Sequence, residues 1–173
     1  FAVVYSLYLY FGHKNQNRML LLASYLFYGA WDYRFLSLIL ISTCVDFVCG
    51  LKIEGAKSRA HKRAFLLLSV VTNLSILGYF KYFDFFVSEL ASLCQLLGLP
   101  FGYESLSIVL PVGISFYTFQ TMSYSIDIYR GDMKATRKFF DFALFVAFFP
   151  QLVAGPIERA RNLLPQITAK RTV

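Results

Sequence analysis

Charged residues are scarce in this chain, and their scarcity excludes most classes of soluble protein. Only 16% of the 173 residues are Asp, Glu, Lys or Arg, whereas 57% are hydrophobic and 18% are aromatic. An ordinary soluble domain carries about 25% charged residues. The charges are grouped between apolar runs, as expected when hydrophilic loops alternate with membrane spans of about 20 residues. The sequence therefore predicts an all-α integral membrane protein, a multi-span helical bundle.

The motifs of soluble enzymes and of metal sites are also missing. The chain has no GxSxG, GxxxxGK[ST], HExxH or GxGxxG sequence. Its three cysteines, Cys44, Cys49 and Cys94, lie within apolar runs without CxxC or Cys/His spacing, so we expect buried hydrophobic side chains and no metal site. The net charge of +7 comes from short basic loops, with no folded basic domain to hold nucleic acid.

The basic loops predict the orientation of the spans. Residues 52–63 and 130–138 are rich in Lys and Arg, whereas residues 31–33 and 98–105 are not. The positive-inside rule therefore places the first two loops in the cytoplasm and the other two outside. The run Met19–Ala30 is short for a span if it ends at Gly29, so we expect an interface around Trp31.

Two segments near the end of the chain are apolar but broken. The first, LPVGISFYTFQTMSYSIDIYR at 110–130, contains Pro111, Gly113, Gln120 and Asp127, which lipid alone cannot satisfy. The second, FFPQLVAGPIERAR at 148–161, is interrupted by prolines and a glycine. Both flanks of 139–156 are basic, so we expect this segment to enter the membrane from the cytoplasm and return to it, with breaks at Pro150 and at Gly155–Pro156. An ordinary kinked span is the alternative.

These motifs carry a family resemblance. The segments GISFYTFQxxSYxIDxYRG and FDFALFVxFFPQLVAGPI, with the earlier LLLASYLFYGAWDYRF and LGYFKYFDFF, resemble the membrane-bound O-acyltransferase family, in the bacterial branch that acetylates alginate and related polysaccharides. The resemblance implies an O-acetyltransferase of the bacterial cytoplasmic (inner) membrane. It also implies an exported polysaccharide as acceptor, an acetyl thioester or carrier as donor, and partner proteins of an acetylation or export system.

The family's catalytic histidine has no counterpart in this chain. The resemblance places it in a later segment rich in tryptophan and histidine, beyond Val173. The two histidines present, His13 and His61, stand among polar residues and are expected in solvated loops. We therefore expect residues 1–173 to be the amino-terminal part of a single acyltransferase domain, truncated at both ends, with no bound cofactor and no activity on its own.

Four polar residues are candidates for lining a substrate funnel. On a helix over 114–129, Gln120, Ser123 and Asp127 share one face, while Ser115, Thr118, Thr121 and Ser125 form another polar stripe. Gln151 lies beside the helix breaks, where backbone groups are exposed. The alternative is that these residues hold neighbouring helices together or cap a broken helix.

Polar residues of the earlier spans have structural interpretations. We expect Asn73 to bond between helices and Asp46 to be solvated or paired at the end of its span.

Two other functions remain open. A secondary transporter or channel subunit would also show broken helices and intramembrane polar residues. Within the family, D-alanyl transfer to teichoic acid is the alternative, which the PQLVAGPI segment disfavours.

Overall fold

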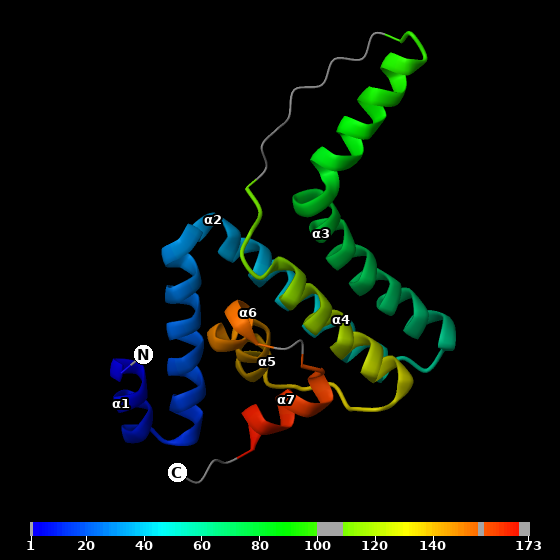
Figure 1. The fold of residues 1–173 in the computed structure, drawn as a ribbon. Coiled ribbons are helices and arrows are strands. Elements are labelled where there is room, and N and C mark those ends of the chain that lie inside the picture. Colours follow the sequence, from blue (N-terminus) through cyan, green and yellow to red (C-terminus); the bar gives the residue numbers. More distant parts are fainter. Residues whose placement is uncertain (1, 100–108, 156–157, 170–173) are drawn as a thin grey trace.

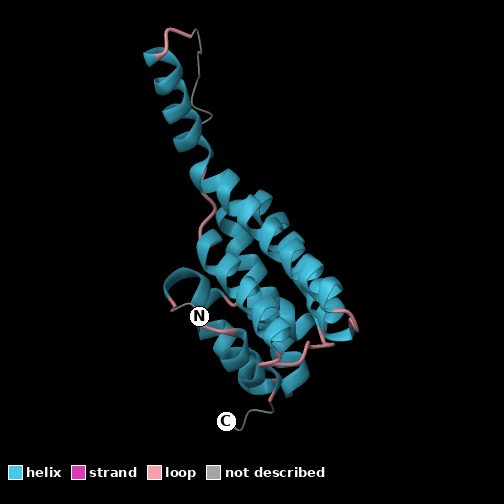
Figure 2. Cartoon of the chain, turned by 90° about the vertical axis from the view of Figure 1, so that its right-hand side faces the viewer, coloured by secondary structure: helices cyan, strands magenta, loops and turns pink. Residues whose placement is uncertain are grey.

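The computed structural model describes residues 2–99, 109–155 and 158–169, and every regular element in these ranges is a helix (Figures 1 and 2). The helices are α1 (Ala2–Tyr10), α2 (His13–Gly55), α3 (Arg59–Leu96), α4 (Ile114–Arg130), α5 (Phe139–Ala147), α6 (Phe149–Ala154) and α7 (Ala160–Thr168). Two of them, α2 and α3, are long and apolar enough to cross a membrane. The predicted all-helical fold is confirmed, and the two long apolar helices are consistent with the predicted membrane protein.

Helix α2 consists of two helical arms joined by a sharp bend. Its 43 residues would extend about 65 Å, roughly twice the hydrocarbon core of a bilayer. The helix bends at Asp32, whose backbone is extended (φ −159°, ψ 111°), and the two arms point in different directions (Figure 1). The Asp32 carboxylate accepts the Arg34 backbone N–H at 2.9 Å and pairs with its guanidinium at 2.7 Å. Asp32 therefore caps the second arm.

The first arm is longer than the sequence predicted. We expected an apolar run beginning at Met19, but the helix begins at His13 and includes the polar turn up to Arg18. This turn is held from inside: the Asn17 amide donates to the Asp141 carboxylate at 3.0 Å and to the Ile167 carbonyl at 2.9 Å. Because the Asn17 amide N–H groups find partners within the protein, the helix can extend through this turn.

Helix α3 is continuous over 38 residues, which is longer than one membrane span needs. Its buried residues, Ser69, Asn73 and Leu77, all lie in its first half. The second half extends away from the other helices, and Figure 2 shows this end projecting beyond the body. The predicted outer loop, 98–105, lies outside the described residues from Pro100 onward.

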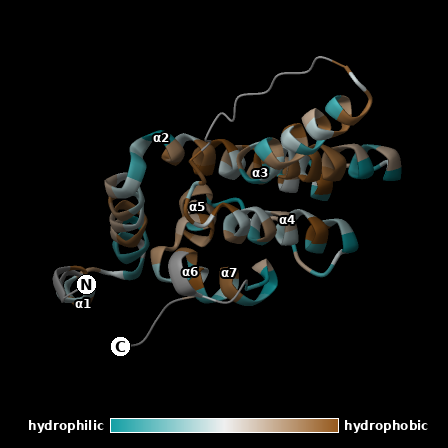
Figure 3. Ribbon diagram, turned by 45° about the horizontal axis from the view of Figure 1, so that its top comes forward, coloured by the Kyte–Doolittle hydropathy of each residue, from teal (hydrophilic) through white to brown (hydrophobic). Residues whose placement is uncertain are grey.

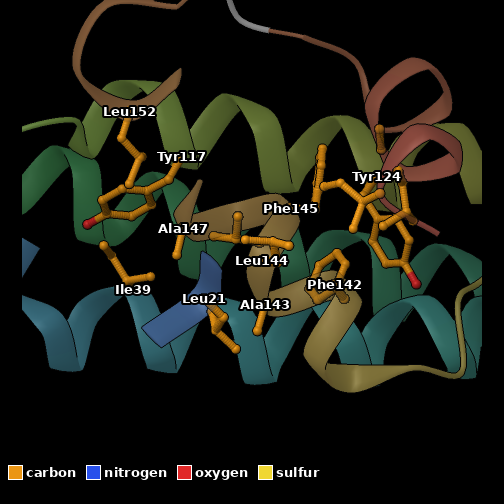
Figure 4. Close-up of a cluster of buried hydrophobic side chains, with 14 of the residues drawn as sticks. Leu21, Ile39, Tyr117, Tyr124, Phe142, Ala143, Leu144, Phe145, Ala147 and Leu152 are labelled. Atoms are coloured by element: carbon orange, nitrogen blue, oxygen red, sulfur yellow. The ribbon is translucent and has the colours of Figure 1, made fainter. Parts of the chain in front are cut away.

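The core forms where α5 inserts between α2 and α4 (Figure 4). Six consecutive α5 residues, Phe142 to Ala147, are at most 1% exposed. The Phe142 ring packs 4.5 Å from the Tyr124 ring, measured between centroids. The long helices expose apolar side chains outward, and hydrophilic residues gather at helix ends and at the bend (Figure 3).

The predicted burial of the cysteines holds for one of the three. Cys49 is buried, Cys94 is half-buried and Cys44 is exposed. On an apolar helix face an exposed cysteine is in keeping with contact to lipid, so burial within protein was too narrow an expectation.

Candidate functional site

The break between α5 and α6 is held together by polar side chains from α4 and α2. Helix α5 ends at Ala147, so its last carbonyls lack partners within the helix. The Gln120 side chain donates to one of them, the Phe145 carbonyl, at 2.6 Å. The Ser24 hydroxyl accepts the Phe149 N–H at 3.3 Å. Both contacts satisfy backbone groups that lipid could not.

The break lies before the position expected from the prolines. The residue that leaves the helical conformation is Phe148 (φ −59°, ψ 104°), and Pro150 stands in the first turn of α6. Proline needs no backbone donor at a helix start, so its ring begins α6 instead of ending α5. The second predicted break is observed, because α6 ends at Ala154 and Gly155 is extended.

Ser123 connects α4 to the start of α7. Its hydroxyl donates to the Gln120 carbonyl at 2.7 Å and accepts the Ala160 N–H at 3.2 Å. Ala160 is the first residue of α7, so Ser123 satisfies one of the N–H groups that a helix start leaves open.

Asp127, one turn further along α4, is the candidate with an unused acceptor. It is 2% exposed, and within the described residues its Oδ2 atom is buried without a hydrogen-bond partner. A buried carboxylate oxygen without a donor is costly. This oxygen can accept a hydrogen bond from a group beyond those described.

Gln151 is 8% exposed and lies in the short helix α6. Its carbonyl accepts the Gly155 N–H at 3.0 Å. A β-carbon added at Gly155 would lie 2.7 Å from both Cα and Cγ of Gln151. The end of α6 therefore has room only for glycine at this position.

The second polar stripe of α4 is part of a hydrogen-bond network that joins three helices. Ser69 of α3 donates to one carboxylate oxygen of Asp46 in α2, and Asn73 donates to the other at 2.7 Å. On the α4 side, Ser69 lies 2.8 Å from the Ser125 hydroxyl, and Thr121 donates to the Asn73 side-chain oxygen at 3.2 Å. All five residues are fully buried. The interhelical role predicted for Asn73 is confirmed.

The prediction for Asp46 is partly wrong. We expected it to be solvated or paired at a span end, but it is 0% exposed and bonded to Ser69 and Asn73. Its partners come from another helix, so sequence position alone did not indicate its burial. The sequence reasoning missed Ser69 altogether. Its position one helical turn before Asn73, on the same face, was the signal available.

The histidines are not in loops. His13 is the first residue of α2 and half-buried, and its buried Nδ1 atom has no hydrogen-bond partner among the residues that the structure describes. His61 is exposed in the first turn of α3. Neither histidine is among the residues that bond to Asp46, Gln120 or Ser123. The polar interior described here therefore bonds and positions groups, and its buried carboxylates are acceptors.

The similarity to known proteins is extensive along this chain. It is 46% identical over 167 residues to a probable alginate O-acetylase, AlgI, of Pseudomonas aeruginosa, covering 95% of this chain and 32% of that protein. A probable alginate O-acetylase of Azotobacter vinelandii is 46% identical over 155 residues, which is 88% of this chain and 31% of the relative. A peptidoglycan O-acetyltransferase of Helicobacter pylori is 34% identical over an alignment of 175 residues, gaps included, that covers 87% of this chain and 32% of the relative.

No family model matches the chain, and no solved structure matches it. The relatives carry the assignment, because similarity at this level extends over nearly all of the chain. The relatives therefore support an O-acetyltransferase family for this chain, which spans about a third of their length.

Proposed function

We propose that the whole protein is a multi-pass O-acetyltransferase of a bacterial cytoplasmic membrane that transfers acetyl groups to hydroxyls of an exported polysaccharide. The observation that carries this proposal is the 46% identity to probable alginate O-acetylases over most of the chain. The peptidoglycan O-acetyltransferase relative supports a carbohydrate polymer as the class of acceptor. Partner proteins of an acetylation or export system would deliver donor and acceptor.

In this proposal, residues 1–173 form an amino-terminal wall of a single acyltransferase domain. The network of Asp46, Ser69, Asn73, Thr121 and Ser125 fixes α2, α3 and α4 against one another. Hydrogen bonds of this kind are suited to joining helices inside a membrane, where apolar surfaces have no preference for each other over lipid. The wall would be rigid before any substrate binds.

The segment α5–α6 would be re-entrant in this arrangement. Helix α5 has nine residues, about 14 Å, which is half of what a crossing needs. Its break at Phe148 is supported by Gln120 and Ser24, so the turn is part of the fold. Basic residues on both sides of the segment favour a return to the cytoplasmic face.

The four candidate residues would have different roles in a substrate funnel, depending on the hydrogen bonds that they already make. Gln120 and Ser123 bond to backbone groups of α5 and α7, so they would shape the funnel wall. Asp127 keeps a buried oxygen that a donor from the rest of the protein, or an acceptor hydroxyl, can use. Gln151 lies at the end of the re-entrant segment, where a substrate would pass the helix break.

The reaction would join an acceptor oxygen to an acetyl carbon. The hydroxyl oxygen attacks the carbonyl of an acetyl thioester, the carbon–sulfur bond breaks, and the hydroxyl proton passes through a base to the leaving thiolate. The resemblance places that base, a histidine, in the part of the protein beyond Val173. Residues 1–173 would contribute position and exclusion of water.

The test is the acetate content of the exported polymer. Deleting the gene is expected to remove acetate released from the polymer by mild base, while the amount of sugar exported stays the same. The full-length gene is expected to restore the acetate, and residues 1–173 alone are not. If export falls and acetate per sugar is unchanged, the protein moves the polymer or a precursor, and the acetyltransferase proposal fails.

A further inference from the structure

Four cations surround one hollow at the end of the helices that carries the α2–α3 connection. Lys57 and Arg59 come from that connection and the start of α3, Lys62 from the first turn of α3, and Arg130 from the end of α4. With Tyr129 they line a pocket of about 420 Å³. Figure 3 shows hydrophilic residues gathered at these two ends, and Figure 1 shows the end of α4 beside the start of α3.

None of these four cations has a carboxylate partner within the described residues. The ion pairs found there are Arg34 with Asp32 and Lys138 with Asp141. Glu54 and Asp132, the carboxylates nearest in sequence, make no ion pair within 4.0 Å there. Like charges brought together repel unless a counter-charge joins them. The fold thus concentrates positive charge from segments about 70 residues apart in sequence without supplying its own anion.

We infer that this pocket is a phosphate-binding site. Arginine and lysine bind phosphate oxygens through charge-assisted hydrogen bonds, and a volume of this size is within the range of ligand pockets. Basic pockets between membrane helices on the cytoplasmic side bind anionic lipid head groups. A soluble molecule that carries phosphates would present the same chemistry to the same four side chains. The inference does not require that the protein transfer acetyl groups.

The alternative is that these four cations are ordinary surface charges without a ligand. A pocket variant and a matched control variant distinguish this alternative from a phosphate-binding site. The double variant Arg59→Gln with Arg130→Gln removes one pocket cation from each segment. The control, Arg63→Gln with Arg137→Gln, removes two exposed cations from the same two regions, outside the pocket lining. Both variants lose the same net charge. Because Arg59 and Arg130 are exposed and make no ion pair within the described residues, the fold should tolerate their loss, and thermal stability is measured as a check.

The full-length protein in nanodiscs is tested with two probes. One is phosphatidylglycerol retained against a phosphatidylcholine background, measured by native mass spectrometry. The other is adenosine 3′,5′-bisphosphate, measured by calorimetry in phosphatidylcholine alone. Each pocket cation removed should weaken binding about fivefold, so the double variant should lose about 25-fold. The control should lose roughly twofold or less, because its two cations are not in the pocket lining and cannot donate hydrogen bonds to a phosphate bound there.

The probe that responds identifies the source of the phosphate. A selective loss of phosphatidylglycerol supports a lipid head group, and a selective loss of the bisphosphate supports a soluble ligand. The inference would be overturned if the pocket variant and the control lost the same amount of binding affinity, or if the pocket variant bound both probes as tightly as the unmodified protein. This experiment measures phosphate binding and does not measure polymer acetylation. A failure of the phosphate-site inference can therefore be distinguished from a failure of the proposed acetyltransferase function.

Discussion

Replacing Gly50 by alanine should destabilise the protein because α2 and α4 touch at this residue. A β-carbon there would lie 2.5 Å from Tyr124 Cε1, 2.9 Å from the Tyr124 hydroxyl and 3.0 Å from Ile128 Cδ1. Tyr124 has little room to move: it is 0% exposed, its hydroxyl accepts the Thr136 N–H at 3.1 Å, and its ring packs on Phe142. The added methyl group must therefore push the helices apart.

The expected cost is about 1–3 kcal/mol, the usual range for overpacking a tight core. Gly29→Ala is the matched control, since Gly29 is in the same helix and a β-carbon there has no neighbour within 4 Å. That change should stabilise the helix by about 0.5–1 kcal/mol, because alanine restricts the unfolded backbone more than glycine does. The two variants are thus predicted to differ in sign.

The measurement is thermal unfolding of the full-length protein in detergent, scored by the fraction that stays monodisperse after heating. A double variant adds a second check, since Gly50→Ala should cost little more in a Tyr124→Ala background, where most of the clash is gone. If Gly50→Ala is as stable as Gly29→Ala, the close approach of α2 and α4 is wrong. If its cost is unchanged in the Tyr124→Ala background, the clash has another source.

Two further predictions concern the polar network and the re-entrant segment. Asn73→Leu removes a donor to the Asp46 carboxylate and should destabilise the protein by about 1–3 kcal/mol, the cost of a buried acceptor left unsatisfied. The control Ser75→Leu, on the exposed face of the same helix, should change stability by less than about 0.5 kcal/mol. Equal effects of the two variants in the same heating assay would show that the network does not stabilise the fold. Cysteines placed at Ser58 and Gln166, in a background without native cysteines, should both resist labelling by an impermeant maleimide until the membrane is opened. Ready labelling of position 166 alone in intact cells would mean that the α5–α6 segment crosses the membrane.

Helix α4 could be predicted from sequence because its signals are local. Its expected range began at Ile114 and ended within one residue of the observed end at Arg130. Gly113 and Gly131 flank it with φ values of 76° and 83°, a conformation that glycine adopts at no steric cost. The ends of this helix depend on those residues and on few distant contacts.

Features that depend on distant contacts were predicted poorly. Asp46 was expected at a span end, and its burial became evident only when Ser69 and Asn73 of α3 were placed against it. The break at Phe148 was expected at Pro150, because proline was interpreted as ending a helix when it begins one. Spacing along one helix shows which residues share a face, but it does not show which helix covers that face.

The burial of α5 has a consequence for the order in which the protein is made. Nine residues are too few for insertion machinery to release into lipid as a span, and six of them, Phe142 to Ala147, have almost no surface outside the protein. Helix α5 is therefore buried only once α2 and α4 have packed around it. A newly made chain in which α2 and α4 pack around α5 too slowly would leave an aromatic segment exposed, and such a segment promotes aggregation.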